Sequence, residues 1–197
     1  MNLRVVRGIL WAFVAVAVLS AGLLVWKHQK DVSRSSSIDI GGPFEMTNHL
    51  GTPVTERDYL GRPIAMFFGF TNCPDICPTT LLRMSDLMSK LGPSAERLQV
   101  VLVSVDPERD TPDVLKSYLE QFDRRFSALT GTSEQLATFA RRYRFYYKKV
   151  LQSDGGYTMD HSAGVFLFNA KAQFVGTLDA HETDDLVLQK LQRLLAL

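Results

Sequence analysis

The chain has 197 residues, of which 46% are hydrophobic, and its 22 basic and 21 acidic side chains leave a formal net charge of +1. This length suits a membrane segment followed by one folded domain, and the composition shows none of the biases typical of disordered or fibrous proteins. Because the charges nearly cancel, no strong field draws the chain to polyanions, and we expect no nucleic-acid partner.

An uncharged apolar run, Gly8–Trp26, lies near the N-terminus between basic residues. A helix of this length spans roughly 28 Å, close to the thickness of a bilayer core. A cleaved signal peptide is the alternative interpretation, because Ser20 and Ala21 are small enough for a cleavage site. The apolar run continues past them to Trp26, a residue type common at membrane interfaces, which favours a retained transmembrane helix.

These features predict three parts: a membrane anchor in residues 1–30, a flexible polar tether in residues 31–40 and a folded domain in residues 41–197. Basic residues flank both ends of the anchor, so charge counting leaves its orientation open. The resemblance of the N-terminus to an export signal suggests a single-pass inner-membrane protein whose domain faces the periplasm, or the intermembrane space of a mitochondrion.

Hydrophobic periodicity and turn residues divide the domain into alternating strands and helices. The expected elements are a hairpin of Phe44–Thr47 with Val54–Thr55, strands at Ile64–Phe70 and Leu98–Val105, helices at Cys77–Leu91, Pro112–Phe122, Ser133–Tyr143 and Glu182–Leu195, and a hairpin of Val165–Phe168 with Phe174–Leu178. This order is typical of a thioredoxin-like α/β sandwich. Neither central strand precedes a glycine-rich phosphate loop, so we do not expect nucleotide binding.

The two cysteines of the chain, Cys73 and Cys77, follow the first central strand. At positions i and i+4 of a helix their Cβ atoms would lie about 5–6 Å apart, so both sulfurs can reach one soft metal ion, whereas a disulfide needs local distortion. Pro74 and Pro78 suit a loop and a first helical turn, so the helix should begin near Cys77. We expect its dipole to lower a nearby thiol pKa.

A soft metal would need at least one more ligand, and the chain offers four histidines. His28, His49 and His181 lie beside the membrane segment or in turns, where solvated side chains are the ordinary expectation. His161 precedes a core strand, and its loop can cross the top of the sheet toward the cysteines. From the residues alone, a metal ligand and a hydrogen-bonded histidine both remain open, as do two roles for Asp160: orienting the imidazole, or solvating the loop.

Three separated motifs together resemble the Sco/SenC family: Phe67–Pro78 around the cysteines, Val103–Pro112, and Asp160-His161-Ser162. The resemblance covers about residues 41–197. It implies a membrane-tethered copper metallochaperone of thioredoxin fold, in which Cys73, Cys77 and His161 match the family's copper ligands. It also implies that copper is delivered to the dinuclear copper centre of cytochrome c oxidase, with the copper-bearing oxidase subunit or another copper chaperone as partner.

The chain departs from the family pattern at two places. Asn72 stands where many relatives have histidine or tyrosine, and Phe168-Asn169 replaces the usual Asp-Pro. Neither position is a proposed ligand, although Asn72 can alter solvent access or redox tuning beside Cys73. A tetrahedral zinc site would want a fourth ligand, which the motifs do not supply.

Two redox functions compete with copper transfer. In the first, Cys73 and Cys77 cycle between dithiol and disulfide and reduce the cysteines of a copper-receiving partner. In the second, a peroxidase of the same fold would use Thr79 or Arg83 to stabilise a peroxide-reactive thiolate. Of the remaining motifs, we interpret Asp106–Pro112 as loop structure and helix capping. The aromatic run from residue 143 to residue 147 fits core packing with a solvated basic face better than a docking surface.

Overall fold

A computed structural model describes residues 40–153 and 155–197, together with a few residues between Arg7 and Trp26. Within this part of the chain, no helix is both long and apolar enough to cross a membrane. The anchor expected in residues 1–30 and the tether expected in residues 31–40 lie largely outside the described residues. Residues Ile40–Leu197 form one compact unit.

A seven-stranded sheet forms the centre of this unit, with the strand order β2-β1-β5-β4-β3-β8-β9. The three central strands, β3, β4 and β5, run parallel, while β1, β8 and β9 each pair antiparallel with a neighbour. The strands are β1 (Glu45–Asn48), β2 (Pro53–Thr55), β3 (Ile64–Gly69), β4 (Gln99–Ser104), β5 (Ser127–Thr130), β8 (Val165–Phe168) and β9 (Phe174–Leu178). A separate two-stranded sheet pairs β6 (Tyr147–Leu151) with β7 (Tyr157–His161).

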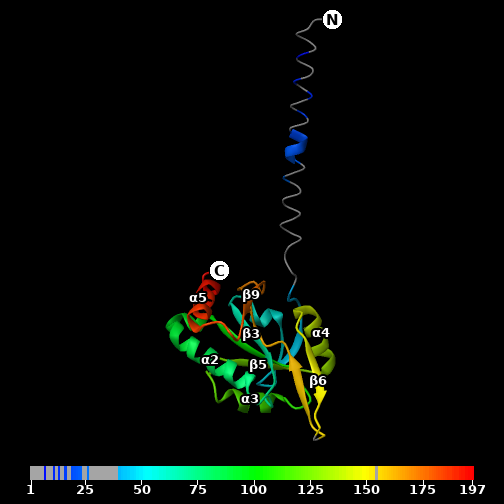
Figure 1. The fold of residues 1–197 in the computed structure, drawn as a ribbon, viewed down its shortest axis with the longest axis vertical. Coiled ribbons are helices and arrows are strands. Elements are labelled where there is room, and N and C mark those ends of the chain that lie inside the picture. The colour runs from blue at the N-terminus through cyan, green and yellow to red at the C-terminus, as the bar shows by residue number, and fades with distance from the viewer. Residues whose placement is uncertain are drawn as a thin grey trace. The chain divides into compact units, whose positions relative to one another are not determined.

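Helices cover both faces of the seven-stranded sheet (Figure 1). They are α2 (Ile76–Leu91), α3 (Pro112–Leu119), α4 (Ser133–Tyr143) and α5 (Asp184–Leu195), with two 3₁₀ segments at Glu56–Tyr59 and Gly92–Arg97. The chain moves from β3 to the adjacent β4 and then to the adjacent β5, in the same direction across the sheet. Because both crossover connections are right-handed, α2 and α3 lie on the same face. α5 packs beside α2 on that face, and α4 covers the other.

The two faces are visible in the alternation along β3, whose six residues are all buried. Phe68 points toward α4, where its ring meets Phe139 edge-on at a centroid distance of 6.5 Å and stacks on Phe145 at 3.9 Å. Phe67 and Gly69 point to the opposite face, toward the N-terminus of α2. Because neighbouring strand residues face opposite sides, a continuous apolar run serves both cores.

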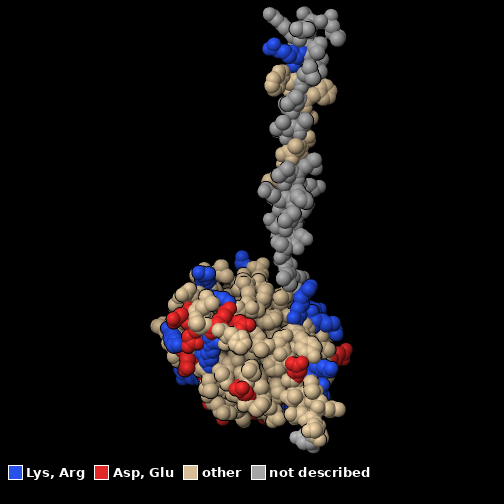
Figure 2. All heavy atoms as spheres, viewed as in Figure 1, with Lys and Arg blue, Asp and Glu red and all other residues tan. Residues whose placement is uncertain are grey.

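The structure confirms the mixed α/β order, and three elements, α4, β8 and β9, coincide with their predicted bounds. Three strands were not predicted, β5, β6 and β7, and the helix expected to reach Phe122 ends at Leu119. In the aromatic run, Tyr143 and Phe145 are buried in the core, as expected, whereas Tyr146 is half exposed. Figure 2 shows basic side chains gathered over α4, and acidic and basic side chains interleaved over α2 and α5.

Candidate metal centre

Three elements bring two sulfurs and one imidazole together at one end of the sheet. Cys73 lies in the loop after β3, Cys77 in the first turn of α2, and His161 at the end of β7. Their ligand atoms all lie within 4.8 Å of one another, and Cys77 Sγ lies 3.8 Å from His161 Nε2. Both cysteines are free thiols; Cys77 is buried and Cys73 partly exposed. The structure therefore assembles the three residues that the sequence motifs singled out.

Gly69 makes room for the inner sulfur. A Cβ atom at this position would lie 2.9 Å from Cys77 Sγ and 2.8 Å from the Phe67 ring, closer than real Cβ contacts allow. The last residue of β3 is thus glycine because the helix that follows brings a buried sulfur against its backbone. α2 begins one residue before Cys77, close to the predicted start.

The imidazole of His161 is oriented by backbone and aromatic contacts. Its Nδ1 lies 3.0 Å from the carbonyl oxygen of Ser162, and a proton donated there leaves the Nε2 lone pair facing the Cys77 sulfur. The rings of Phe67 and Phe70 approach the imidazole edge-on, at centroid distances of 6.3 and 5.8 Å. This arrangement fixes the tautomer that a metal ligand needs.

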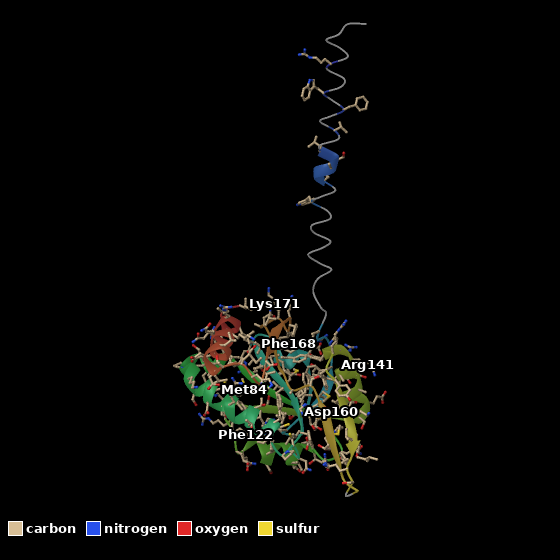
Figure 3. The ribbon with its side chains drawn as sticks, viewed as in Figure 1. Met84, Phe122, Arg141, Asp160, Phe168 and Lys171 are labelled. Atoms are coloured by element: carbon tan, nitrogen blue, oxygen red, sulfur yellow. The ribbon has the colours of Figure 1, made fainter. Side chains whose placement is uncertain are left out.

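One expectation about this part of the chain is wrong, and one alternative that the sequence left open can be decided. His161 does not lie in a loop but ends a strand, because residues 157–161 pair with β6. Asp160, its neighbour on that strand (Figure 3), is exposed. The Ser162 carbonyl oxygen, and not Asp160, contacts the imidazole nitrogen. Of the two roles left open for Asp160, the structure favours solvation.

The expectation of a lowered thiol pKa is wrong for Cys77. Burial raises the pKa of this thiol well above its usual range, and a hydrogen bond with the backbone of Phe70 offsets only part of the effect. The helix N-terminus acts at this site, but a sulfur with no solvent exposure loses more from desolvation than it gains from the dipole. In the metal-free protein the inner sulfur is therefore a neutral thiol at physiological pH.

The loop between β4 and α3 fixes the cysteine side of the site. Asp110, which is fully buried, accepts hydrogen bonds from the Thr71 hydroxyl at 2.6 Å, the Thr71 backbone N–H at 3.1 Å and the Ser104 hydroxyl at 2.6 Å. Thr71 lies two residues before Cys73. The carboxylate thus ties the start of the cysteine loop to the end of β4.

The same loop also fixes the histidine side. Tyr157, the first residue of β7, donates its hydroxyl to Asp106 at 3.0 Å, and its carbonyl accepts from Arg109 at 3.1 Å. The Arg109 guanidinium lies 3.9 Å from the centre of the Tyr157 ring and forms an ion pair with Asp106. Residues 106–110 therefore join the two parts that carry the thiols and the imidazole.

The sequence analysis did not predict that residues 106–110 join the cysteine side of the site to the histidine side. It did correctly predict Thr111 as the cap of α3, where the Thr111 side chain accepts from the Val114 N–H.

Among the described residues, the other histidines do not contribute to this site. His49 Nδ1 accepts from the Ala128 N–H at 3.3 Å, His181 is exposed, and His28 lies outside the described residues. Arg83, considered for a peroxidase, donates instead to Asp184 at 2.9 Å, so its guanidinium faces α5.

The fold is a thioredoxin-like α/β sandwich, and two thiols and an imidazole lie at the carboxyl end of its central strands. These two features define a class of proteins that carry a soft-metal or thiol-redox site at that position. The SCO1/SenC family model matches residues 32–196, and the chain belongs to that family.

Individual relatives agree with this assignment. The chain is 33% identical to mitochondrial SCO2 of Saccharomyces cerevisiae over 92% of its length, and 32% identical to SenC of Rhodobacter capsulatus over 89%. It is also similar to the solved structure of Bradyrhizobium japonicum ScoI with copper bound, with 40% identity and a TM-score of 0.73, covering 78% of this chain and 98% of that one. The chain spans 65% of the yeast protein and 83% of SenC.

Proposed function

We propose that this protein is a copper metallochaperone that binds one copper ion through Cys73, Cys77 and His161. The observation that carries the proposal is the convergence of two sulfurs and an imidazole nitrogen within 4.8 Å of one another. The copper-bound structure of the similar Bradyrhizobium japonicum protein supports copper as the metal.

The donor set favours copper over zinc. Two thiolates and one imidazole suit Cu(I), which accepts soft ligands at low coordination number. Structural zinc sites are almost always four-coordinate, and among the described residues no further histidine, cysteine or carboxylate joins the group. With the described residues alone, a zinc site here would need a water or a partner's side chain as its fourth ligand.

The unequal burial of the two sulfurs suits transfer of the ion. Since the pKa of the Cys77 thiol is raised by burial, copper must displace its proton, and loading releases protons to solvent. Cys73 is the more exposed sulfur, so an incoming ligand meets it first. Copper then passes by ligand exchange, with Cys77 as the last ligand to leave.

Membership of the SCO1/SenC family supports the dinuclear copper centre of cytochrome c oxidase as the destination, with the copper-bearing oxidase subunit or another copper chaperone as partner. The same membership, with mitochondrial and bacterial relatives, supports a periplasmic or intermembrane-space location. In this proposal residues 1–30 anchor the protein as a single-pass helix, residues 31–40 form the tether, and residues 41–197 carry the copper.

Copper stoichiometry tests the proposal. The whole chain is purified anaerobically in detergent, reduced and loaded with copper, alongside His161→Ala and, as a matched control, His181→Ala. We expect one copper per chain in the wild type and the control, with thiolate-to-Cu(II) absorption in the samples loaded with Cu(II), and loss of both in His161→Ala. Equal copper retention in His161→Ala would refute the ligand assignment.

A thiol–disulfide oxidoreductase is the second candidate, because the free thiols lie close together and one is exposed. It would reduce target cysteines while Cys73 and Cys77 form a disulfide. His161→Ala separates the two functions, since it removes a copper ligand but neither thiol. A wild-type protein that retains no copper yet cycles its disulfide readily would favour the oxidoreductase.

A further inference from the structure

An apolar hollow of about 260 Å³ opens beside the metal centre, between the start of α2, the hairpin of β8 and β9, and α5. It adjoins the centre on two sides: Ile76 directly precedes Cys77, and Ala163 lies two residues beyond His161. Ile76 is 44% exposed, although its side chain is large and apolar. The floor of the hollow consists of buried side chains from four elements, namely Met84, Leu87, Val165, Leu178 and Val187.

Two exposed carboxylates, Asp75 and Asp179, line the mouth of this hollow. Asp75 accepts from the Thr79 hydroxyl at 3.4 Å, and Asp179 accepts from the His181 N–H at 2.8 Å. Within the described part of the chain, neither forms an ion pair. Arg83 also lines the hollow and pairs with Asp184, which Lys90 shares, so the two lining carboxylates outnumber the one lining cation. The mouth is therefore negative and the floor apolar.

We propose that this hollow receives one bulky apolar side chain of the copper-receiving protein, with a lysine or arginine beside it against Asp75 and Asp179. This inference rests on the proposed function, because transfer by ligand exchange needs a partner held beside Cys73. A cavity of about 150 Å³ is enough for a benzene ring, so the hollow has room for an aromatic or long aliphatic side chain. Unpaired carboxylates around an apolar floor match a basic segment and disfavour an acidic one.

Short peptides without metal ligands test the proposal independently of copper. The ¹⁵N-labelled, reduced whole chain in nanodiscs is titrated with acetyl-Gly-Lys-Phe-Lys-Gly-amide and with versions that carry Lys-Ala-Lys or Glu-Phe-Glu. We expect amide shifts confined to the neighbourhood of Ile76, Ala163 and Ala180, and binding at least five-fold weaker for each altered peptide. Equal affinity for all three peptides, or shifts spread over other faces, would overturn the proposal.

Variants of the protein provide a second test of the proposed docking site. Ala180→Trp fills the mouth, and Asp179→Asn removes one of its charges; we expect at least five-fold and about two-fold weaker peptide binding, respectively. Ala196→Trp and Glu120→Gln, exposed and away from the hollow, are the matched controls. Unchanged peptide affinity in Ala180→Trp would contradict the inference. So would a wild-type dimer, measured by sedimentation, that Ala180→Trp dissociates, because a second copy would then occupy the hollow.

Copper stoichiometry measured on the same samples separates this inference from the proposed function. We expect Ala180→Trp to bind one copper per chain while losing the peptide. If the wild type binds the peptide but no copper, the metallochaperone assignment fails and the docking site stands. If it binds copper but not the peptide, the docking site fails alone.

Discussion

Replacing Asp110 by alanine should destabilise the domain and loosen the metal centre, because this buried carboxylate accepts three hydrogen bonds. A buried donor left without its acceptor costs about 1–3 kcal/mol. The two hydroxyl donors can turn toward other acceptors, so we expect a total loss of about 3 kcal/mol rather than the full sum. For a domain of this size such a loss lowers Tm by roughly 6–12 °C. Urea unfolding and calorimetry of the copper-free, reduced protein measure it.

Asp110→Asn separates hydrogen bonding from charge. The amide oxygen can accept from the Thr71 N–H and the Ser104 hydroxyl, while the amide nitrogen donates to the Thr71 hydroxyl, so we expect a loss below about 1 kcal/mol. Burial raises the pKa of Asp110 above its ordinary value of 3.8, so its contribution to stability declines as pH rises through the folded pKa. The amide variant should lack that decline. A loss under 1 kcal/mol in Asp110→Ala would refute the reasoning.

Three further changes test other contacts. Gly69→Ala should cost about 1–3 kcal/mol in urea unfolding and shift the copper absorption bands, since its Cβ would lie 2.9 Å from Cys77 Sγ. A hydrogen bond from Arg125 holds the pKa of Asp123 below its ordinary value. The stabilisation that this provides is lost as pH falls through the folded pKa. Asp123→Asn should therefore make the free energy of unfolding fall less steeply with decreasing pH below pH 4. Tyr157→Phe removes the 3.0 Å hydrogen bond to the β4–α3 loop and should speed copper loss to a chelator several-fold, followed by stopped-flow absorbance.

Each of these predictions has an internal check. Gly164→Ala is the matched control for Gly69→Ala, because its new Cβ would meet only the Leu178 carbonyl oxygen, at an ordinary contact distance of 3.5 Å, and its φ is not in the left-handed region. For Asp123→Asn, an acid limb of the stability curve as steep as that of the wild type would refute the reasoning. Tyr146→Phe is the matched control for Tyr157→Phe, and equal copper loss in both would show that the lost hydroxyl bond has no role.

The order of the main elements could be predicted because local patterns encode it. Ile64–Gly69 has no polar side chain, Val100–Val103 is an apolar run at the centre of β4, and Thr111 with Pro112 is a strong helix start. The strand β6 lacks any such signal: four of its five residues are exposed, and its sequence, with two lysines, carries no buried stripe. It is held by pairing with β7 and by contacts of Tyr157, which depend on residues far away in the chain.

The candidate ligand set could be predicted from the sequence only through the family motifs, since spacing alone relates Cys73 to Cys77 but not to His161, 84 residues beyond Cys77. The raised pKa of Cys77 could not be predicted, because the helix dipole is a local property whereas desolvation depends on how the whole core closes around the sulfur. The same applies to Asp110, whose partner Thr71 is 39 residues away.

The division of the centre among separate elements bears on how copper would leave it. Cys77 is fixed by α2 and the closed core beneath Gly69, whereas His161 belongs to a two-stranded sheet distinct from the main sheet and tied to it by polar contacts at residues 106–110. Elements held by few contacts open at lower free energy than a packed core. If the protein transfers copper as proposed, a partner would meet resistance in a defined order: the partly exposed Cys73 and the imidazole would yield first, and the buried Cys77 would hold the ion until the new ligands are in place.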